Sequence, residues 1–216
     1  MDRENRTMTA KESSIPDLPV APAGLRERKK IKTRRAIRRE AYRLFREHGY
    51  DATTVDQIAE AAEISPSTFF RYFPSKEDVV LTDEYDPLLV EILRSAPEGT
   101  SLIRIVRTGV VDALRRIMRE EGEEMVTRMS LVVRVPALRR RSYEQQMESW
   151  SLMAEAYAAR TGRSARDFDL RVAVSAINAA MSDAILTWAE GGCVGDPAVL
   201  VDRALGILEA GLRDGP

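Results

Sequence analysis

Apolar side chains recur at helical spacing along most of this sequence of 216 residues. Between positions 26 and 48, the apolar residues that share one helical face are Ile37, Ala41, Leu44 and Phe45. Gly49 follows them and can supply the left-handed conformation in which many helices end. No segment alternates apolar and polar residues as a half-buried strand does, so the pattern predicts an all-α fold.

Two short helices are expected next, and each begins with a recognisable cap. Thr54 and Gln57 have the spacing of a capping box, in which each side chain bonds the other residue's backbone N–H. The inner face of this second helix is formed by Val55, Ile58, Ala59 and Ala62. Ser65 and Pro66 combine an N-cap with proline at the first helical position, so they open a third helix, which Pro74 ends.

Ser75 caps a fourth helix, which the apolar spacing extends through Val79 and Val80 to about Leu93. Further helices are expected at 101–121, about 123–134, 137–161, 168–190 and 197–211, separated by glycine and proline. Residues 1–24 are rich in serine and proline and lack periodicity, which predicts a disordered arm. The expected organisation is therefore this arm, a three-helix domain at 25–75, and a helical domain at 76–216.

The second and third helices are joined by a tight turn, as in a helix-turn-helix unit. In such a unit the last short helix enters the major groove of DNA, and its first turns reach the bases. The polar side chains placed to do so are Ser67, Thr68 and Tyr72. Phe69 and Phe73 are four residues apart, so they share a face that is expected to pack inwards on Phe45, Ile58 and Ile64.

Basic residues are concentrated in the first helix, although the formal net charge of the chain is only −1. They are Arg26, Arg28, Lys29, Lys30, Lys32, Arg34, Arg35, Arg38, Arg39, Arg43 and Arg46. Only Glu27 and Glu40 oppose them, so this segment indicates a polyanionic partner, here double-stranded DNA. The residues expected to contact DNA are Arg26, Lys29, Lys30, Lys32, Arg34, Thr53, Thr54, Ser65, Ser67, Thr68, Arg71, Tyr72 and Lys76.

The composition argues against several kinds of chemistry. Cys193 is the only cysteine and His48 the only histidine, which excludes an intramolecular disulfide and disfavours a zinc site or a Ser-His-Asp triad. We therefore expect no enzyme activity, no metal and no cofactor. No run of about 18 apolar residues and no signal-peptide pattern is present, so we expect a cytoplasmic protein without a membrane span.

The last two expected helices have broad apolar faces that suit a dimer interface. The residues expected there are Leu170, Ala173, Ile177, Ala180, Ala184, Trp188, Leu200, Ala204, Ile207 and Leu208. Pairing two such hairpins gives a four-helix bundle. A dimer also suits a helix-turn-helix protein, because two recognition helices can read both halves of a palindromic site.

Several side chains of the C-terminal half admit two interpretations. Core packing is the simpler one for Met118, Met125, Met129, Met147, Trp150, Met153 and Met181, but methionine also suits a pocket for varied apolar ligands. The run Arg139–Arg141 is either a solvated helix face or a docking site for an anionic ligand. His48 is interpreted as structural or solvated, and Cys193 as incidental because it has no partner thiol.

The segment 41–81, AYRLFREHGYDATTVDQIAEAAEISPSTFFRYFPSKEDVVL, resembles the DNA-binding domain of TetR-family regulators. Its marks are Phe45 with Gly49-Tyr50, the Thr53-Thr54 and Ile58-Ala59 pairs, the stretch from Ser65 to Phe73, and Ser75-Lys76-Glu77. Many members have Gly where this chain has Ser67, and Tyr where it has Phe70. Phe70 has no hydroxyl to offer a phosphate, which puts that family contact in doubt.

The resemblance implies a homodimer on a palindromic operator and an effector pocket in the middle helices. A ligand there would move the fourth helix and change the spacing of the two recognition helices. The expected effector is an apolar or amphipathic small molecule. The chain is also similar to regulators that sense acyl-CoA-like ligands, for which Arg139–Arg141 would be the phosphate partner.

Three other functions stay open at this stage. An activator or nucleoid-associated protein would use the same DNA-binding domain, and a small-molecule carrier would use the helical core alone. A hydrolase is the weakest alternative, because no serine has a credible base. The effector, the operator, the regulated genes and the direction of regulation do not follow from the sequence.

Overall fold

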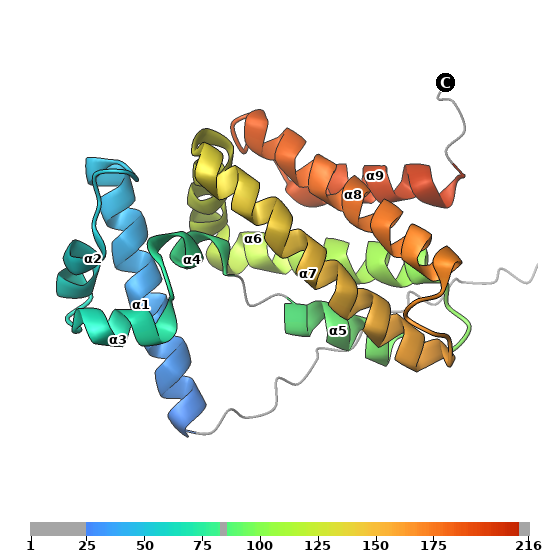
Figure 1. The fold of residues 1–216 in the computed structure, drawn as a ribbon. Helices are drawn as coiled ribbons and strands as arrows, with labels where there is room; N and C mark the ends of the chain where they lie inside the picture. Colours follow the sequence, from blue (N-terminus) through green and yellow to red (C-terminus); the bar gives the residue numbers. More distant parts are fainter. Residues whose placement is uncertain (1–24, 83–85, 212–216) are drawn as a thin grey trace, which may run out of the picture.

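The computed structural model describes residues 25–82 and 86–211, so the arm expected at 1–24 lies outside the described residues. Nine helices and no strand occur in the described part, which confirms the all-α prediction. The helices are α1 (Leu25–His48), α2 (Val55–Ala61), α3 (Pro66–Tyr72), α4 (Lys76–Leu81), α5 (Asp86–Ser95), α6 (Leu102–Arg134), α7 (Pro136–Thr161), α8 (Phe168–Glu190) and α9 (Pro197–Glu209). Figure 1 shows α1–α3 at one end, with α4 between them and the larger bundle α5–α9.

The expected caps are present. The Thr54 side chain accepts from the backbone N–H of Gln57, whose side chain accepts from that of Thr54, so the capping box is complete. Ser65 and Ser75 cap α3 and α4 in the same way, through the N–H groups of Thr68 and Asp78. Each hydroxyl satisfies a helix N–H that has no partner within the helix.

An aromatic cluster holds the short helices against α1, as predicted. Phe69 and Phe73 are fully buried, and their ring centroids lie 6.1 Å apart. Phe45 of α1 and Ile58 of α2 are buried in the same core. The opposite face of α3 is therefore free to point away from the body of the protein.

The fourth helix is shorter than predicted. It ends at Leu81, and a separate helix, α5, covers most of the remaining stretch to Ser95. The physical reason is Pro87, which lacks a backbone N–H and is tolerated only in the first turn of a helix. The apolar spacing through Val79 and Val80 misled the prediction because it continues in phase across this break.

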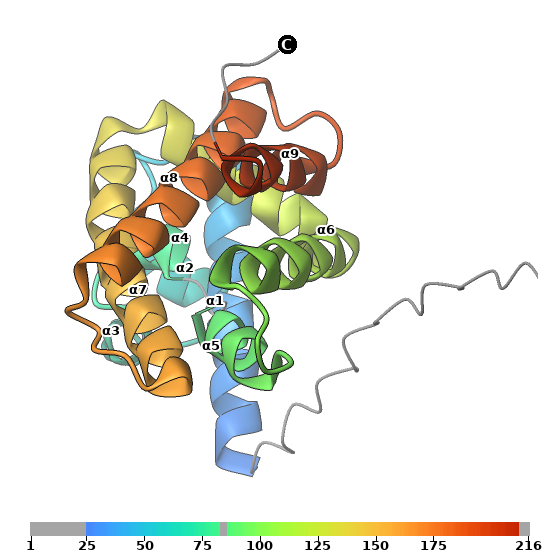
Figure 2. The same ribbon diagram turned by 90° about the vertical axis from the view of Figure 1, so that its right-hand side faces the viewer.

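The larger bundle is built around α6, which is kinked. Glu121 has non-helical torsion angles (φ −136°, ψ 25°), next to the boundary expected at Gly122. In Figure 2 the segment of α6 before the kink lies near α5 and α9, and α8 crosses between α9 and α7. The tight α6, α8 and α9 packing buries Leu205 and Val201 of α9 almost completely.

By length and mean hydropathy, α8 would be able to span a membrane. It has 23 residues, and its most apolar window has a mean hydropathy of 1.3. The core helix of a helical bundle meets the same criterion, and α8 packs on α6, α7 and α9. About one third of that window is buried in this chain. Much of the surface of α8 therefore remains uncovered in a single chain.

Gly109 of α6 gives a test of the packing between α5 and α6. A Cβ at this position would lie 2.2 Å from Cγ2 of Ile92, a buried β-branched side chain of α5. We expect Gly109→Ala to lower the free energy of unfolding by about 1–3 kcal/mol, because the core must shift to accept the methyl group. Urea denaturation at fixed protein concentration measures the change.

Gly122→Ala is the matched control, because the nearest atom to its Cβ would be Cε of Met118 at 3.7 Å. This substitution should be neutral or stabilise the helix by up to about 1 kcal/mol. Equal effects of the two substitutions would contradict the close approach of α5 and α6.

Candidate nucleic-acid interface and internal cavity

The outer face of α3 carries a cluster of exposed groups. Oγ of Ser65 lies 2.9 Å from Oγ of Ser67 and donates to Oγ1 of Thr68 over 3.0 Å, so three hydroxyls gather at the start of the helix. One turn later, the side chain of Phe70 is 52% exposed. Its ring lies edge-on to Phe69, which is buried beneath it. The helix therefore presents hydroxyls and an apolar ring on the same side of the molecule.

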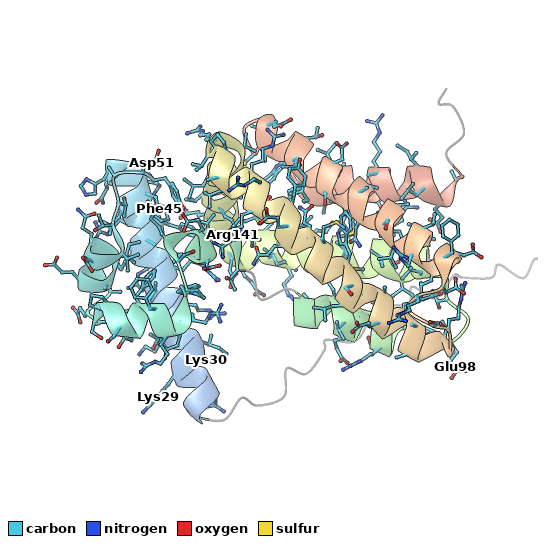
Figure 3. All side chains as sticks on the ribbon, viewed as in Figure 1. Lys29, Lys30, Phe45, Asp51, Glu98 and Arg141 are labelled. Carbon is cyan, nitrogen blue, oxygen red and sulfur yellow. The ribbon has the colours of Figure 1, made fainter. Side chains whose placement is uncertain are left out.

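Cationic groups extend this surface. Arg71 is exposed and its guanidinium lies over the ring of the partly buried Tyr72, 5.4 Å from the centroid. Lys29 and Lys30 project from the end of α1 below α3 (Figure 3), and Lys32 is exposed in the next turn. Arg26 is the second residue of α1.

Other cations of the basic segment have partners within the protein. Arg34 is partly buried, and its guanidinium lies 5.0 Å from the ring centroid of Phe73. Arg43 pairs with Glu40 and Glu47 at 3.0 and 2.6 Å. The cations of the first turns of α1 are therefore exposed, whereas Arg34 and Arg43 make intramolecular contacts that direct part of their charge inwards.

Two residues predicted to contact DNA have inward-facing roles instead. Thr53 is 1% exposed, and its hydroxyl donates to the carbonyl oxygens of Leu44 and Gly49. The prediction for Thr53 is therefore wrong, because the adjacent Thr54 and not Thr53 faces outwards. Lys76 donates from Nζ to the carbonyl oxygens of Tyr50 and Thr53 at 2.7 and 3.0 Å.

The ammonium of Lys76 also lies 4.2 Å from the centroid of the Tyr50 ring. This side chain thus ties α4 to the loop between α1 and α2. Burial, together with the neighbouring Glu77 carboxylate, raises the pKa of the Tyr50 phenol. Lys76 is better explained as the residue that positions this loop than as a direct phosphate ligand.

An ion pair connects the start of α4 to α7. Nη2 of Arg141 lies 2.7 Å from Oδ1 of Asp78, and Nη1 donates to Oγ of Ser75. The Ser75 hydroxyl also donates to Oδ2 of Asp78 over 2.7 Å. Asp78 is buried, so these contacts replace the hydrogen bonds that its carboxylate would otherwise make with water. Figure 3 shows Arg141 at the junction between the two parts of the molecule.

A second connection joins α1 to the end of α4 and to the kinked region of α6. Arg38 donates from Nη2 to the carbonyl oxygen of Thr82 over 2.8 Å, and its Nε lies 3.3 Å from Oε1 of Glu124. Burial raises the pKa of the Glu124 carboxyl, while the charge of Arg38 opposes that effect. Nη2 of Arg35 lies 3.5 Å from Oε1 of Glu121, the residue at the kink. Both ends of α4 are therefore held by arginines.

A cavity of about 420 Å³ lies inside the bundle and reaches the end of α4. Leu81 and Thr82 form part of its wall, together with residues of α5, α6, α7, α8 and α9. Most of the wall is apolar. Its size is within the range of small-molecule sites in proteins.

Five of the seven predicted pocket residues line this cavity. They are Met125, Met129, Trp150, Met153 and Met181. The prediction is wrong for Met147, which is 60% exposed, and for Met118, which packs on the core outside the cavity. Both lie on other faces of their helices, which residue type alone does not reveal.

The sequence interpretation missed the polar part of the cavity wall. Arg128 of α6 and Asn178 of α8 line it, as do Gln146 and Ser182, whose hydroxyl donates to Oε1 of Gln146. Asn178 could have been predicted from the sequence as a polar group of the interior, because it interrupts an otherwise apolar stripe of its helix.

The run Arg139–Arg141 does not form a single anion site. Arg139 pairs with Glu190 at 2.9 Å, whereas Arg141 pairs with Asp78 on α4. Arg139 and Arg141 are two positions apart, so they leave the helix about 200° apart and point to nearly opposite sides of α7. The suggested role as a phosphate partner is therefore wrong for the run as a whole.

The structure divides the predicted dimer residues into two sets. Leu170, Ile177, Ala184 and Trp188 are buried within their own chain, so they cannot form the interface as predicted. Ala173 and Ile207 are exposed, and Ala180, Leu200, Ala204 and Leu208 are partly buried. The prediction did not separate the face of α8 that packs internally from the face that remains uncovered.

The uncovered face of α8 consists mainly of small residues. The side chains Val172, Ser175, Ala179, Asp183 and Thr187 recur at helical spacing and are all exposed. On α9, Val199 is 58% exposed and Ile207 is 49% exposed. From Ser175 to Thr187 the side chains of this stripe are small or short, whereas Phe168 at the start of α8 is large and 76% exposed.

The remaining candidates have ordinary surroundings. His48 is exposed at the end of α1, 3.9 Å from Glu47. Cys193 is partly buried in the turn before α9, with φ 59°, and its sulfur lies 3.9 Å from Oγ of Ser130. Within the described residues, no group of three or more His, Cys, Asp or Glu side chains could hold a metal ion.

Comparison with protein families assigns both parts of the chain. Residues 37–82 match the family described as bacterial regulatory proteins, tetR family, and residues 100–213 match the MftR C-terminal domain. The HTH-type transcriptional regulator TcmR of Streptomyces glaucescens is 36% identical over 164 residues, which cover 72% of this chain and 73% of TcmR.

Solved structures share the fold. The TetR-family repressor FadR of Thermus thermophilus, in complex with lauroyl-CoA, is 27% identical with a TM-score of 0.53, covering 85% of this chain and 97% of FadR. NalD, the secondary repressor of the MexAB-OprM multidrug efflux pump in Pseudomonas aeruginosa, is 20% identical with a TM-score of 0.57, over 85% of this chain and 97% of its own.

Arg141→Met tests the connection between α4 and α7. We expect it to lower the free energy of unfolding by about 1–2 kcal/mol, because the buried Asp78 carboxylate loses its cationic partner while Arg141 is itself partly exposed. Arg140→Met, at the adjacent exposed position, is the control and should change stability by less than about 0.5 kcal/mol. Urea denaturation compares them, and equal stability of the two variants would rule out a structural role for the ion pair.

Proposed function

The chain belongs to the TetR family of bacterial transcriptional regulators, and from this we infer how it acts. We propose that it is a repressor that binds a palindromic operator as a homodimer and leaves it when a small apolar or amphipathic molecule binds. The observation that carries this proposal is the cavity whose wall includes the end of α4, next to the DNA-binding helices. Its site of action is the bacterial cytoplasm, where the operator is, and it needs neither a cofactor nor catalytic activity.

In this proposal the DNA-binding domain at 25–75 uses α3 as its recognition helix. Ser67 and Thr68 offer hydroxyls to base edges, and Ser65, Thr54, Arg71 and Tyr72 lie around them. The exposed ring of Phe70 suits the methyl group of a thymine, an apolar feature of the major groove. It takes the place of the phosphate contact that a tyrosine would make there.

Phosphate contacts are assigned to the first turns of α1. Arg26, Lys29, Lys30, Lys32 and Arg34 belong to this group, although Arg34 also stacks on Phe73. Such contacts determine affinity and its dependence on salt more than the choice of sequence.

The helical domain at 76–216 supplies the effector site and the dimer interface. A ligand in the cavity would touch Leu81 and Thr82 directly, so it can favour one position of α4 over another. Because α4 is also held by Arg141 and Arg38, a shift of α4 changes the placement of α1–α3. In a dimer, that shift alters the spacing of the two recognition helices.

The second candidate, an activator, is separated from a repressor by the position of the operator. Footprinting of the bound promoter decides this, because a site that overlaps the polymerase-binding region indicates repression. A carrier without DNA-binding function would give no salt-dependent binding to any duplex.

Tyr72→Ala tests the assigned DNA surface. With a duplex selected from a random library by the wild-type protein, we expect the affinity of the variant to fall at least about tenfold, a loss of about 1.4 kcal/mol or more. Fluorescence anisotropy measures binding, and circular dichroism and sedimentation check that the protein stays folded and dimeric. Tyr143→Ala, at an exposed tyrosine of α7, is the matched control. Unchanged affinity of Tyr72→Ala would overturn the assignment.

Ala179→Arg tests the proposed dimer face. This residue is exposed in the chain, so arginine should leave the fold intact but prevent close approach of two α8 helices. Sedimentation equilibrium is expected to show at least tenfold weaker dimerisation, and operator affinity should fall with it. Ala159→Arg, on the exposed side of α7, should remain dimeric. A fully dimeric Ala179→Arg variant would show that the subunits meet elsewhere.

A further inference from the structure

We propose that the cavity selects an apolar molecule with an acidic or strongly hydrogen-bond-accepting group, which Asn178 and Arg128 bind. This inference rests on the proposed function, in which the cavity is the effector site, and adds the chemical class of the effector. It follows from the polar side chains of the wall, their charge and the shape of the apolar remainder.

Asn178 is the first piece of evidence. The residue lines the cavity and is only 4% exposed, yet its Nδ2 has no hydrogen-bond partner. A buried N–H group without a partner costs about 1–3 kcal/mol, so most such groups in folded proteins are satisfied. A ligand oxygen in the cavity would satisfy it.

Arg128 is the second piece of evidence. Its side chain lines the same cavity, and Nε is buried. A guanidinium has only donors, so it complements carboxylate, carbonyl or phenolate oxygens and repels a cation. No aspartate or glutamate is found among the residues that line this cavity in the described part of the chain. An ammonium ligand would therefore find no carboxylate among these wall residues with which to pair.

The rest of the wall suits an apolar body of variable shape. Met125, Met129, Met153 and Met181 contribute flexible side chains, and Trp150 contributes a flat one. Methionine adapts to differently shaped apolar ligands at low cost. We therefore expect the cavity to be selective for the polar group of the ligand and to tolerate apolar parts of different shapes.

A series of side-chain contacts connects the same cavity to the DNA-binding helices. Arg128 interacts electrostatically with Glu124, one helical turn earlier, and Glu124 pairs with Arg38 of α1. Arg38 in turn holds the carbonyl oxygen of Thr82, which is itself in the cavity wall. A ligand anion beside Arg128 competes with Glu124 for that guanidinium, so it perturbs the cluster that holds α1 and the end of α4.

Matched ligand pairs test the proposed class. Decanoate and 2-naphthylacetate are the acidic probes; decylammonium and 2-(2-naphthyl)ethylammonium have the same apolar bodies with a cationic group. Calorimetric titration of the 216-residue protein is expected to show at least tenfold tighter binding of each acid than of its amine. Equal binding of acid and amine, or no binding of either acid, would overturn the proposal.

Substitutions then assign the preference to residues. Arg128→Met should reduce the ratio of acid to amine affinity at least tenfold, whereas Arg128→Lys should keep most of it. Asn178→Leu, similar in volume, should weaken both acids about fivefold or more, because the ligand oxygen loses its donor. Arg119→Met, at an exposed position of α6, is the matched control and should leave the ratio unchanged. A ratio that Arg128→Met does not change would contradict the assignment.

A separate measurement distinguishes this inference from the function on which it rests. Anisotropy with the selected operator duplex shows whether a saturating acid releases the DNA. Tight, Arg128-dependent binding of an acid that leaves DNA affinity unchanged would support the ligand class and contradict the effector role of the cavity. Release of DNA by the amines but not by the acids would keep the effector role and reject the class.

Discussion

The geometry of the DNA-binding part depends on how three very short helices are held in place. α2 and α3 have seven residues each and α4 has six, and helices of this length are not stable on their own in water. Their caps satisfy the first N–H groups, but burial of Phe69 and Phe73 beside α1 supplies most of the stabilisation. The exposed face of α3 is therefore only as well placed as the aromatic core beneath it.

The position of α4 is determined from both ends. Its first turn is connected to α7 through Arg141 and Asp78, and the residue that follows its last turn accepts a hydrogen bond from Arg38. Its middle is buried, and its end forms part of the cavity wall. In the proposed function, a six-residue helix with these contacts would move as a unit, so a change in the cavity would be passed to α1–α3 as a displacement.

α8 has a different role on each of its faces. Leu170, Val174 and Ile177 pack inside the bundle, whereas Asn178 and Met181 line the cavity. The exposed face of small residues is left for a second subunit in the proposed dimer. In the proposed function, ligand binding and subunit contact would therefore involve the same helix, and a ligand would influence both the position of α4 and the relation between subunits.

The sequence by itself determined what depends on local chemistry. The helical class, the capping box at Thr54, the proline-opened α3 and the aromatic stripe of Phe69 and Phe73 all followed from residue spacing. These features depend on neighbours within one or two turns, which a sequence records directly. The break before α5 also has a local cause in Pro87, although the apolar spacing obscured it.

Only the tertiary structure decided which partner each side chain has. Periodicity places residues on a common face but does not say what that face meets. For this reason Thr53 is buried rather than exposed, and Arg139 and Arg141 pair with different helices. For the same reason, four of the six α8 residues predicted at the dimer interface are internal. Arg128 and Asn178 come together at one cavity although 49 residues separate them in the sequence, because α6 and α8 pack side by side. Long-range packing of this kind arises from the burial of whole helices, so the residues that neighbour each position in the sequence do not predict it.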